Sequence, residues 1–219
     1  MKRPILTLLA LCLPLLAAAQ EELPWGLPYD VYYLMPSFGD GLVYIKGQGP
    51  AQGKLNICAL NNTLRFLDND GKEVEANETE SIIMVRIDTV SFLQDGGVFF
   101  RMYPVSGDLG VALRRNVVVH KDVKEGAFGT QSHTSSITEY KNVYVDGISY
   151  DLNKSKKYPY NVTETVFLYK GNDILVLNKR NLRKLFPEKK AEIDDWFKQK
   201  HSLPETVEEA RAFLALWAD

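Results

Sequence analysis

Between residues 29 and 177, short apolar segments rich in Val, Ile, Tyr and Phe alternate with clusters of Gly, Asn and Asp. Such segments are typical of β-strands, because β-branched and aromatic side chains pack well on a pleated surface. No helical period of adequate length separates them. The expected strands are residues 29–34, 42–46, 54–60, 63–67, 81–93 (bent or split), 98–103, 111–115, 117–119, 143–145, 148–152, 165–170 and 173–177.

Four of the gaps between these segments have the composition of tight hairpin turns. They are Asn69-Asp70-Gly71, Asp95-Gly96-Gly97, Asp146-Gly147 and Gly171-Asn172-Asp173. Gly, Asn and Asp tolerate the positive φ angles that such turns require. Consecutive hairpins predict an antiparallel meander rather than parallel strands joined by crossover helices.

Two stretches lack the strand pattern and are expected to be irregular. The first is residues 104–110, and the second is residues 121–141, which are polar throughout. A loop as long as the second one is uncommon inside a compact domain, and it is either functional or simply mobile.

After Asn178 the apolar residues recur at helical spacing instead. We expect two longer helices, one within residues 188–201 and one that begins near Pro204. The two helices are expected to form a hairpin packed on the sheet, with Trp196 and Trp217 in the core. The predicted fold is α+β: an antiparallel β meander, as an open sheet, a roll or a partly closed barrel, with a C-terminal helical hairpin at about residues 181–218. The apolar positions are Leu182, Leu185, Phe186, Ile193, Trp196, Phe197, Val207, Ala210, Phe213, Leu214 and Trp217.

The first 20 residues have the three-part layout of a secretory signal peptide. Lys2 and Arg3 are followed by an apolar run at residues 5–16 and then by Ala17-Ala18-Ala19. The run is shorter than the roughly 20 residues of a membrane-spanning helix. We expect cleavage after Ala19 rather than an uncleaved anchor. Residues 1–19 are then the signal peptide and residues 20–219 a single exported β-rich domain, periplasmic or extracellular and not inserted in a membrane.

Composition and charge narrow the classes of partner. The chain of 219 residues is 45% hydrophobic and 25% charged, as in ordinary globular proteins. Losing Lys2 and Arg3 leaves 24 basic residues against 28 acidic ones, a net charge of −4. This balance favours neither nucleic acid nor anionic membranes as partners. Cys58 becomes the only cysteine, in an apolar run, so we expect a buried thiol and no intrachain disulfide.

The C-terminal region also resembles a known group of proteins. The segment from Phe167 to Asp173 leads into Leu177-Asn178-Lys179-Arg180-Asn181-Leu182-Arg183-Lys184-Leu185-Phe186-Pro187-Glu188-Lys189-Lys190 and then into a closing helical pair. This arrangement is similar to that of secreted, β-rich proteins of unknown function found in Bacteroidota. Residues 53–67 and 82–92 are similar to their N-terminal β region. The resemblance implies export across the inner membrane of a diderm bacterium, and it implies neither a reaction nor a substrate.

A search for chemistry finds only weak candidates. His120 and Asp122 share one strand face, and with His133 they form the best candidate for a metal or acid/base cluster; Glu125 lies between the two histidines in the sequence. The alternative is a strand end that runs into a polar loop, which we favour because histidines without a close partner seldom act as ligands. His201 lies at the end of a predicted helix, where the helix dipole favours a cation.

Other patterns have structural explanations of equal or greater weight. The basic run Lys154-Ser155-Lys156-Lys157-Tyr158 suits a polyanion or a solvated turn. Tyr29, Tyr32 and Tyr33 suit a carbohydrate or peptide groove, or a half-buried strand. The carboxylate pairs Asp68/Asp70 and Asp194/Asp195 suit a turn and a solvated helix face.

Serine-nucleophile elbows, phosphate-binding glycine loops and complete calcium loops are absent from the sequence. We therefore predict no catalytic, cofactor-binding or metal residues and no cofactor. The expected function is that of an exported, non-catalytic protein that binds a small ligand or an envelope protein. The alternatives are a hydrolase or metal-dependent enzyme with a site near residues 121–141, and a docking module that uses an exposed strand edge.

Overall fold

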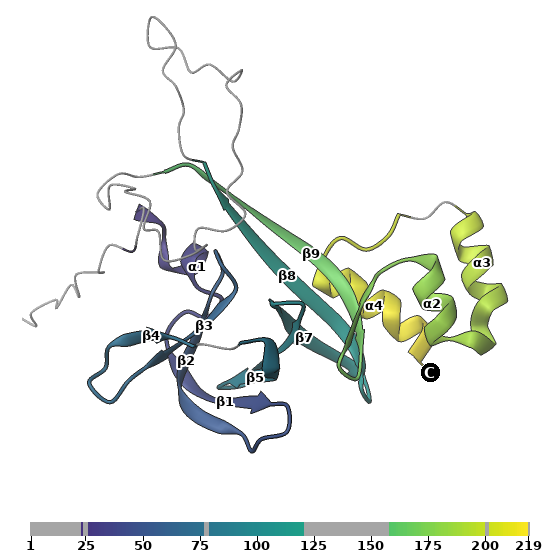
Figure 1. The fold of residues 1–219 in the computed structure, drawn as a ribbon. Coiled ribbons are helices and arrows are strands. Elements are labelled where there is room, and N and C mark those ends of the chain that lie inside the picture. The colour runs from purple at the N-terminus through teal and green to yellow at the C-terminus, as the bar shows by residue number, and fades with distance from the viewer. Residues whose placement is uncertain (1–22, 24–25, 77–78, 121–157, 200–201, 219) are drawn as a thin grey trace, which may run out of the picture.

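The computed structural model describes residues 23, 26–76, 79–120, 158–199 and 202–218. Ten strands in this part of the chain form one antiparallel sheet in the order β10-β9-β8-β7-β6-β5-β1-β2-β3-β4 (Figure 1). The end strands β10 and β4 do not pair, so the sheet is open, and C-terminal helices complete the predicted α+β fold. The strands are β1 (Gly39–Ile45), β2 (Ala51–Cys58), β3 (Thr63–Leu67), β4 (Glu73–Glu75), β5 (Ile82–Ile87), β6 (Val90–Asp95), β7 (Val98–Ser106), β8 (Leu109–Val119), β9 (Tyr160–Lys170) and β10 (Asp173–Val176).

Two meanders make up the sheet, and the pairing of β1 with β5 joins them. The first contains β1 to β4, and the second contains β5 to β10. The helices and 3₁₀ turns are α1 (Tyr29–Tyr32), η2 (Thr79–Ser81), α2 (Lys179–Leu185), η3 (Pro187–Lys189), α3 (Lys190–Lys198) and α4 (Val207–Ala218). Among the described residues, no helix has both the length and the apolar character that crossing a bilayer requires.

Turn chemistry explains most of the hairpins. Gly71 (φ 75°) lies between β3 and β4, Gly96 (φ 56°) and Gly97 (φ 80°) lie between β6 and β7, and Gly171 (φ 59°) lies between β9 and β10. These are the positions where the sequence predicts tight turns, and glycine adopts their left-handed backbone without strain. Asp88 (φ 51°) divides the predicted strand 81–93 into β5 and β6.

The strands β8 and β9 form the longest element of the molecule. They pair over eleven residues each, from Leu109 opposite Lys170 to Val119 opposite Tyr160. Figure 1 shows this ribbon running from the helical end of the molecule to the end near α1. The sequence predicts two strands in place of β8, because exposed Asn116 interrupts its apolar pattern.

The C-terminal helices cover the sheet near β7 and β8. Helix α4 contacts both strands, and α3 contacts α2. The Trp196 and Phe213 rings, with centroids 4.8 Å apart, join α3 to α4. Trp217 is buried and Trp196 packs against the same core, as predicted. That core is the buried cluster Leu109, Val111, Leu168, Leu177, Leu182, Phe186, Ile193, Val207, Ala210, Phe213, Leu214 and Trp217.

Helix α4 begins later than the sequence predicts. Its first residue is Val207, not a residue next to Pro204. Thr206 Oγ1 accepts a hydrogen bond from Glu209 N (3.2 Å), and Glu209 Oε2 accepts one from Thr206 N (3.3 Å). This reciprocal pair is a capping box, and it fixes the start of the helix.

The prediction of a strand at residues 29–34 is wrong. The carbonyl of Pro28 accepts hydrogen bonds from Val31 N and Tyr32 N (both 3.0 Å), which closes the single turn of α1. The aromatic and β-branched composition favours a strand, but Pro28 supplies a suitable φ before the turn and Val31 and Tyr32 bury their side chains. Tertiary packing has overridden strand propensity here.

Residues 104–110 are also not irregular, because β7 and β8 extend into them and leave only a short turn with Gly107 (φ 56°). The predicted strands at 143–145 and 148–152, the loop at 121–141 and the signal peptide lie outside the described residues.

Candidate functional site

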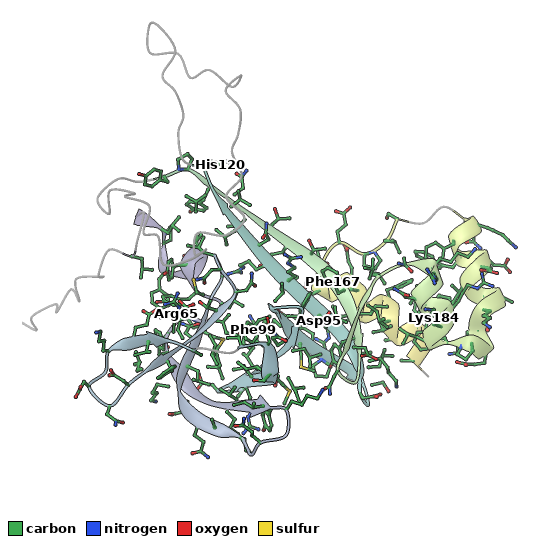
Figure 2. All side chains as sticks on the ribbon, viewed as in Figure 1. Arg65, Asp95, Phe99, His120, Phe167 and Lys184 are labelled. Carbon is green, nitrogen blue, oxygen red and sulfur yellow. The ribbon has the colours of Figure 1, made fainter. Side chains whose placement is uncertain are left out.

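Positive charge is concentrated in one hollow on the surface of the C-terminal helices. The hollow has a volume of about 560 Å³, and we call it the cationic groove. Figure 2 labels one of its residues, Lys184, at the helical end of the molecule, far from His120 at the opposite end of the β8–β9 ribbon. Five of its six lining residues are cations: Lys179, Arg180, Arg183, Lys184, Pro187 and Lys190.

Local sequence explains why these cations face outward together. The side chain of Asn178 accepts a hydrogen bond from Asn181 N (2.9 Å) and caps the start of α2. Leu182 and Phe186 are buried in the helical core, which leaves the other face of α2 to solvent. Pro187 cannot continue the helix, so the chain turns through η3 and brings Lys190 back to the same hollow.

One carboxylate contacts the groove cations. Asp194 Oδ1 of α3 lies 2.9 Å from Lys179 Nζ and 3.7 Å from Arg183 Nε of α2. The contact with Lys179 has the largest effect and lowers the pKa of this carboxyl, desolvation opposes it, and the charges of Arg183 and Lys179 add to the lowering, so the pKa lies below its ordinary value. Asp194 therefore ties α3 to α2, whereas the sequence suggests only a solvated helix face.

The remaining cations of the groove differ from Lys179 and Arg183 in this respect. Within the described part of the chain, Arg180, Lys184 and Lys190 form no ion pair with a carboxylate. Guanidinium groups offer a planar fork of donors that matches carboxylate and phosphate oxygens, and ammonium groups add compact charges. The groove is thus equipped to hold an anion, and its lining residues include no Ser, Thr, Cys, His, Asp or Glu.

A second hollow, of about 670 Å³, lies over β1, β2 and β5. Its charged residues are two acids, Asp40 and Asp88, and two bases, Lys54 and Arg86. Lys54 Nζ lies 2.9 Å from Asp40 Oδ1, so part of this charge is already neutralised by a surface ion pair. This hollow offers no excess of charge to a ligand, and it is the weaker candidate.

The tyrosines near the N-terminus pack against one another in a core cluster, Tyr29 only partly buried. Tyr32 and Tyr33 are buried, and Tyr33 Oη donates a hydrogen bond to Glu73 Oε2 (2.6 Å). The side chain of Arg65 is only 12% exposed, and it pairs with two glutamates. Its Nη2 lies 2.7 Å from Glu75 Oε2, and its Nη1 lies 3.7 Å from Glu73 Oε1. Burial raises the pKa of Tyr33, and the hydrogen bond to Glu73 adds to the effect. These groups satisfy one another and form a structural network.

Other candidates from the sequence are explained by structure as well. Cys58 is buried, and burial raises the pKa of its thiol, as expected of a core residue. Asp68 Oδ1 accepts hydrogen bonds from Asp70 N (3.0 Å) and Lys72 N (2.9 Å), which stabilises the turn between β3 and β4. Asp195 pairs with Lys198 on the surface of α3 at 2.8 Å.

The proposed histidine cluster falls largely outside the described residues. His120 follows β8, and its backbone N–H donates a hydrogen bond to the Pro159 carbonyl (2.8 Å). Asp122, Glu125 and His133 lie outside the described residues. The same holds for His201 and for residues 154–157, whereas Tyr158 is buried against Val117 and Val119. Among the described residues, no three His, Cys, Asp or Glu side chains are grouped to hold a metal ion.

No family model, curated protein or solved structure matches the chain. The fold and the groove define only a class: an α+β protein with an open antiparallel sheet and a cationic surface groove on its C-terminal helices.

Proposed function

We propose that this chain is an exported, non-catalytic binding protein of the cell envelope, and that its cationic groove holds an oligoanionic ligand. The single observation that carries the proposal is the grouping of five cations around one hollow, with Asp194 as the one carboxylate that pairs with them among the described residues. The signal-peptide pattern of residues 1–19 supports export to the periplasm or the extracellular space.

The contrast between local and overall charge supports a specific site. The full chain carries a net charge of −2, so it has no general attraction for anions. The twelve residues from Lys179 to Lys190 nevertheless contain six basic side chains and one acidic one. Such segregation raises the local concentration of anions at one surface while the rest of the protein repels them.

The chemistry of the lining favours phosphate or carboxylate groups, and more than one of them per ligand. Arg180 and Arg183 suit bidentate contacts, while Lys184 and Lys190 supply separate charges across the hollow. A volume of about 560 Å³ lies within the range of small-ligand sites. The same groups occur on soluble phosphorylated compounds and on anionic headgroups, so a test must separate these two sources.

Titration calorimetry of the full chain with sodium tripolyphosphate tests the proposal. We expect the affinity for tripolyphosphate to fall as the salt concentration is raised. We also expect the double variant Arg180→Glu/Lys184→Glu to lower this affinity about tenfold or more. The matched control Lys46→Glu/Arg86→Glu changes net charge equally at a distance from the groove and is expected to retain the affinity. Equal loss in both variants, or no binding by the unmodified chain, would contradict the proposal.

The source of the anion is tested by sedimentation with phosphatidylglycerol vesicles. If the natural ligand is a soluble compound, tripolyphosphate binds but vesicles do not sediment the protein. If it is a headgroup, the protein sediments with the vesicles, and tripolyphosphate releases it.

A further inference from the structure

Part of strand β9 has a free edge. β9 pairs with β8 along its whole length, but on its other side β10 pairs only with residues 167–170. Residues 160–166 therefore have no partner strand on that side within the described part of the chain. We call this segment, Tyr160-Asn161-Val162-Thr163-Glu164-Thr165-Val166, the β9 free edge.

The hydrogen-bonding groups of this edge point in a direction that the ladder defines. At one end of the ladder, Gly171 N donates to the Asp108 carbonyl (2.9 Å), and at the other end His120 N donates to the Pro159 carbonyl (2.8 Å). In β9, the main-chain N–H and C=O groups of the odd-numbered residues therefore point toward β8. Since main-chain groups alternate along a strand, the N–H and C=O groups of Tyr160, Val162 and Glu164 point away from β8. No strand in the described part of the chain pairs with these groups, and a further strand could do so.

The edge is also open on both faces and lacks the usual protection. Six successive residues, 160–165, are exposed, including Tyr160 (37%) and Val162 (42%). The segment contains neither Lys nor Pro, the residues that commonly block edge pairing. By contrast, the opposite edge strand β4 is three residues long and carries two glutamates. The one charge of the free edge, Glu164, is paired with Arg115 at 2.7 Å.

We propose that the β9 free edge pairs antiparallel with the same edge of a second copy of this chain, with the two-fold axis at Thr163. Thr163 is the middle residue of the edge, so this register pairs all seven free residues. Tyr160 then faces Val166 of the second copy, Asn161 faces Thr165, and Val162 faces Glu164. Aromatic pairs with β-branched residues are favourable across strands, and this register keeps the two Glu164 side chains from lying directly opposite each other.

A two-fold interface of this kind is self-complementary, as in most homodimers. It is small, because a standard interface uses about 20–30 residues on each side. We therefore expect a weak, reversible dimer that forms at micromolar or higher concentrations. This pairing is independent of what the cationic groove binds.

Cysteine cross-linking tests the register in the full chain carrying Cys12→Ser, where Cys58 is buried and unreactive. Residue 163 lies at a position that does not hydrogen-bond across the new interface, where Cα atoms are about 4.5 Å apart, a distance that a disulfide spans. Thr163→Cys is expected to form a disulfide-linked dimer under mild oxidation. Asn161→Cys and Thr165→Cys are matched controls that are expected to stay monomeric separately and to form a mixed dimer when combined.

Charge substitutions at Val162 provide a second, sign-dependent test by sedimentation. Val162 is exposed, so its replacement leaves the core intact. Val162→Glu places a carboxylate opposite Glu164 of the second copy and should weaken association several-fold, whereas Val162→Lys places an ammonium there and should strengthen it. Failure of Thr163→Cys to cross-link above the separate controls, or equal effects of the two Val162 variants, would overturn the pairing.

Discussion

Replacing Asn56 with alanine should unfold the N-terminal part of the sheet at a much lower denaturant concentration. Asn56 is the one amide or charged residue that is buried among the described residues, and it is fully enclosed. Its Oδ1 accepts from Met35 N (3.1 Å) and Ile57 N (2.8 Å), and its Nδ2 donates to the Met35 carbonyl (3.1 Å) and to Tyr29 Oη (3.2 Å). The residue therefore holds the segment after α1 against β2.

The size of the effect follows from the groups left behind. Alanine leaves two N–H groups and one carbonyl without this partner in a buried site, and each such group costs about 1–3 kcal/mol. The lower bound predicts a loss of about 3 kcal/mol in the free energy of unfolding, a large share of the 5–15 kcal/mol typical of a domain. With a urea dependence of about 2 kcal/mol per molar, the midpoint should fall by about 1.5 M.

Equilibrium urea unfolding followed by circular dichroism measures this loss. Asn172→Ala, at an exposed position in the turn between β9 and β10, is the matched control and should change stability by less than about 0.5 kcal/mol. A loss below about 1 kcal/mol for Asn56→Ala would refute the reasoning, because the four hydrogen bonds would then contribute little.

Three further predictions concern titration, thiol access and processing. Burial raises the pKa of Tyr32 and Tyr33 above the ordinary 10.0, so the unfolded chain loses these protons at a lower pH than the folded chain does. The melting temperature should therefore fall as pH rises through about 10, and it should fall less steeply in Tyr33→Phe. Equal slopes of melting temperature against pH in the two proteins would contradict this. In the Cys12→Ser chain, a thiol reagent should label Cys58 only after urea is added, and rapid native labelling would show that it is not enclosed. Expression in a diderm bacterium should yield a mature chain that begins at Gln20 by mass spectrometry, whereas an intact Met1 would disprove cleavage.

Most strands could be predicted because alternation and turn chemistry act locally. Segment 63–67 coincides with β3, and the glycines at 71, 96, 97 and 171 mark real turns. The failures come from non-local effects. The turn at α1 depends on burial of Val31 and Tyr32, and the continuity of β8 depends on its pairing with β9 across exposed Asn116. Strand β4 has only three residues, two of them glutamates, so it gives no apolar signal.

The cationic groove could not be predicted from the sequence to the same extent. The density of basic residues between Lys179 and Lys190 is visible in the sequence, but a dense basic run is as common on a solvated surface as at a binding site. What distinguishes the groove is three-dimensional. Burial of Leu182, the break at Pro187 and the ion pairs of Asp194 place cations from α2 and from the start of α3 around one hollow.

Backbone amide chemical shifts, followed by nuclear magnetic resonance as tripolyphosphate is added to the full chain, test the central claim most directly. The account predicts that the shifts that change with ligand cluster in α2, η3 and the start of α3, around Arg180, Lys184 and Lys190. Changes centred instead on the hollow near Lys54 and Arg86, or no changes at millimolar ligand, would contradict it.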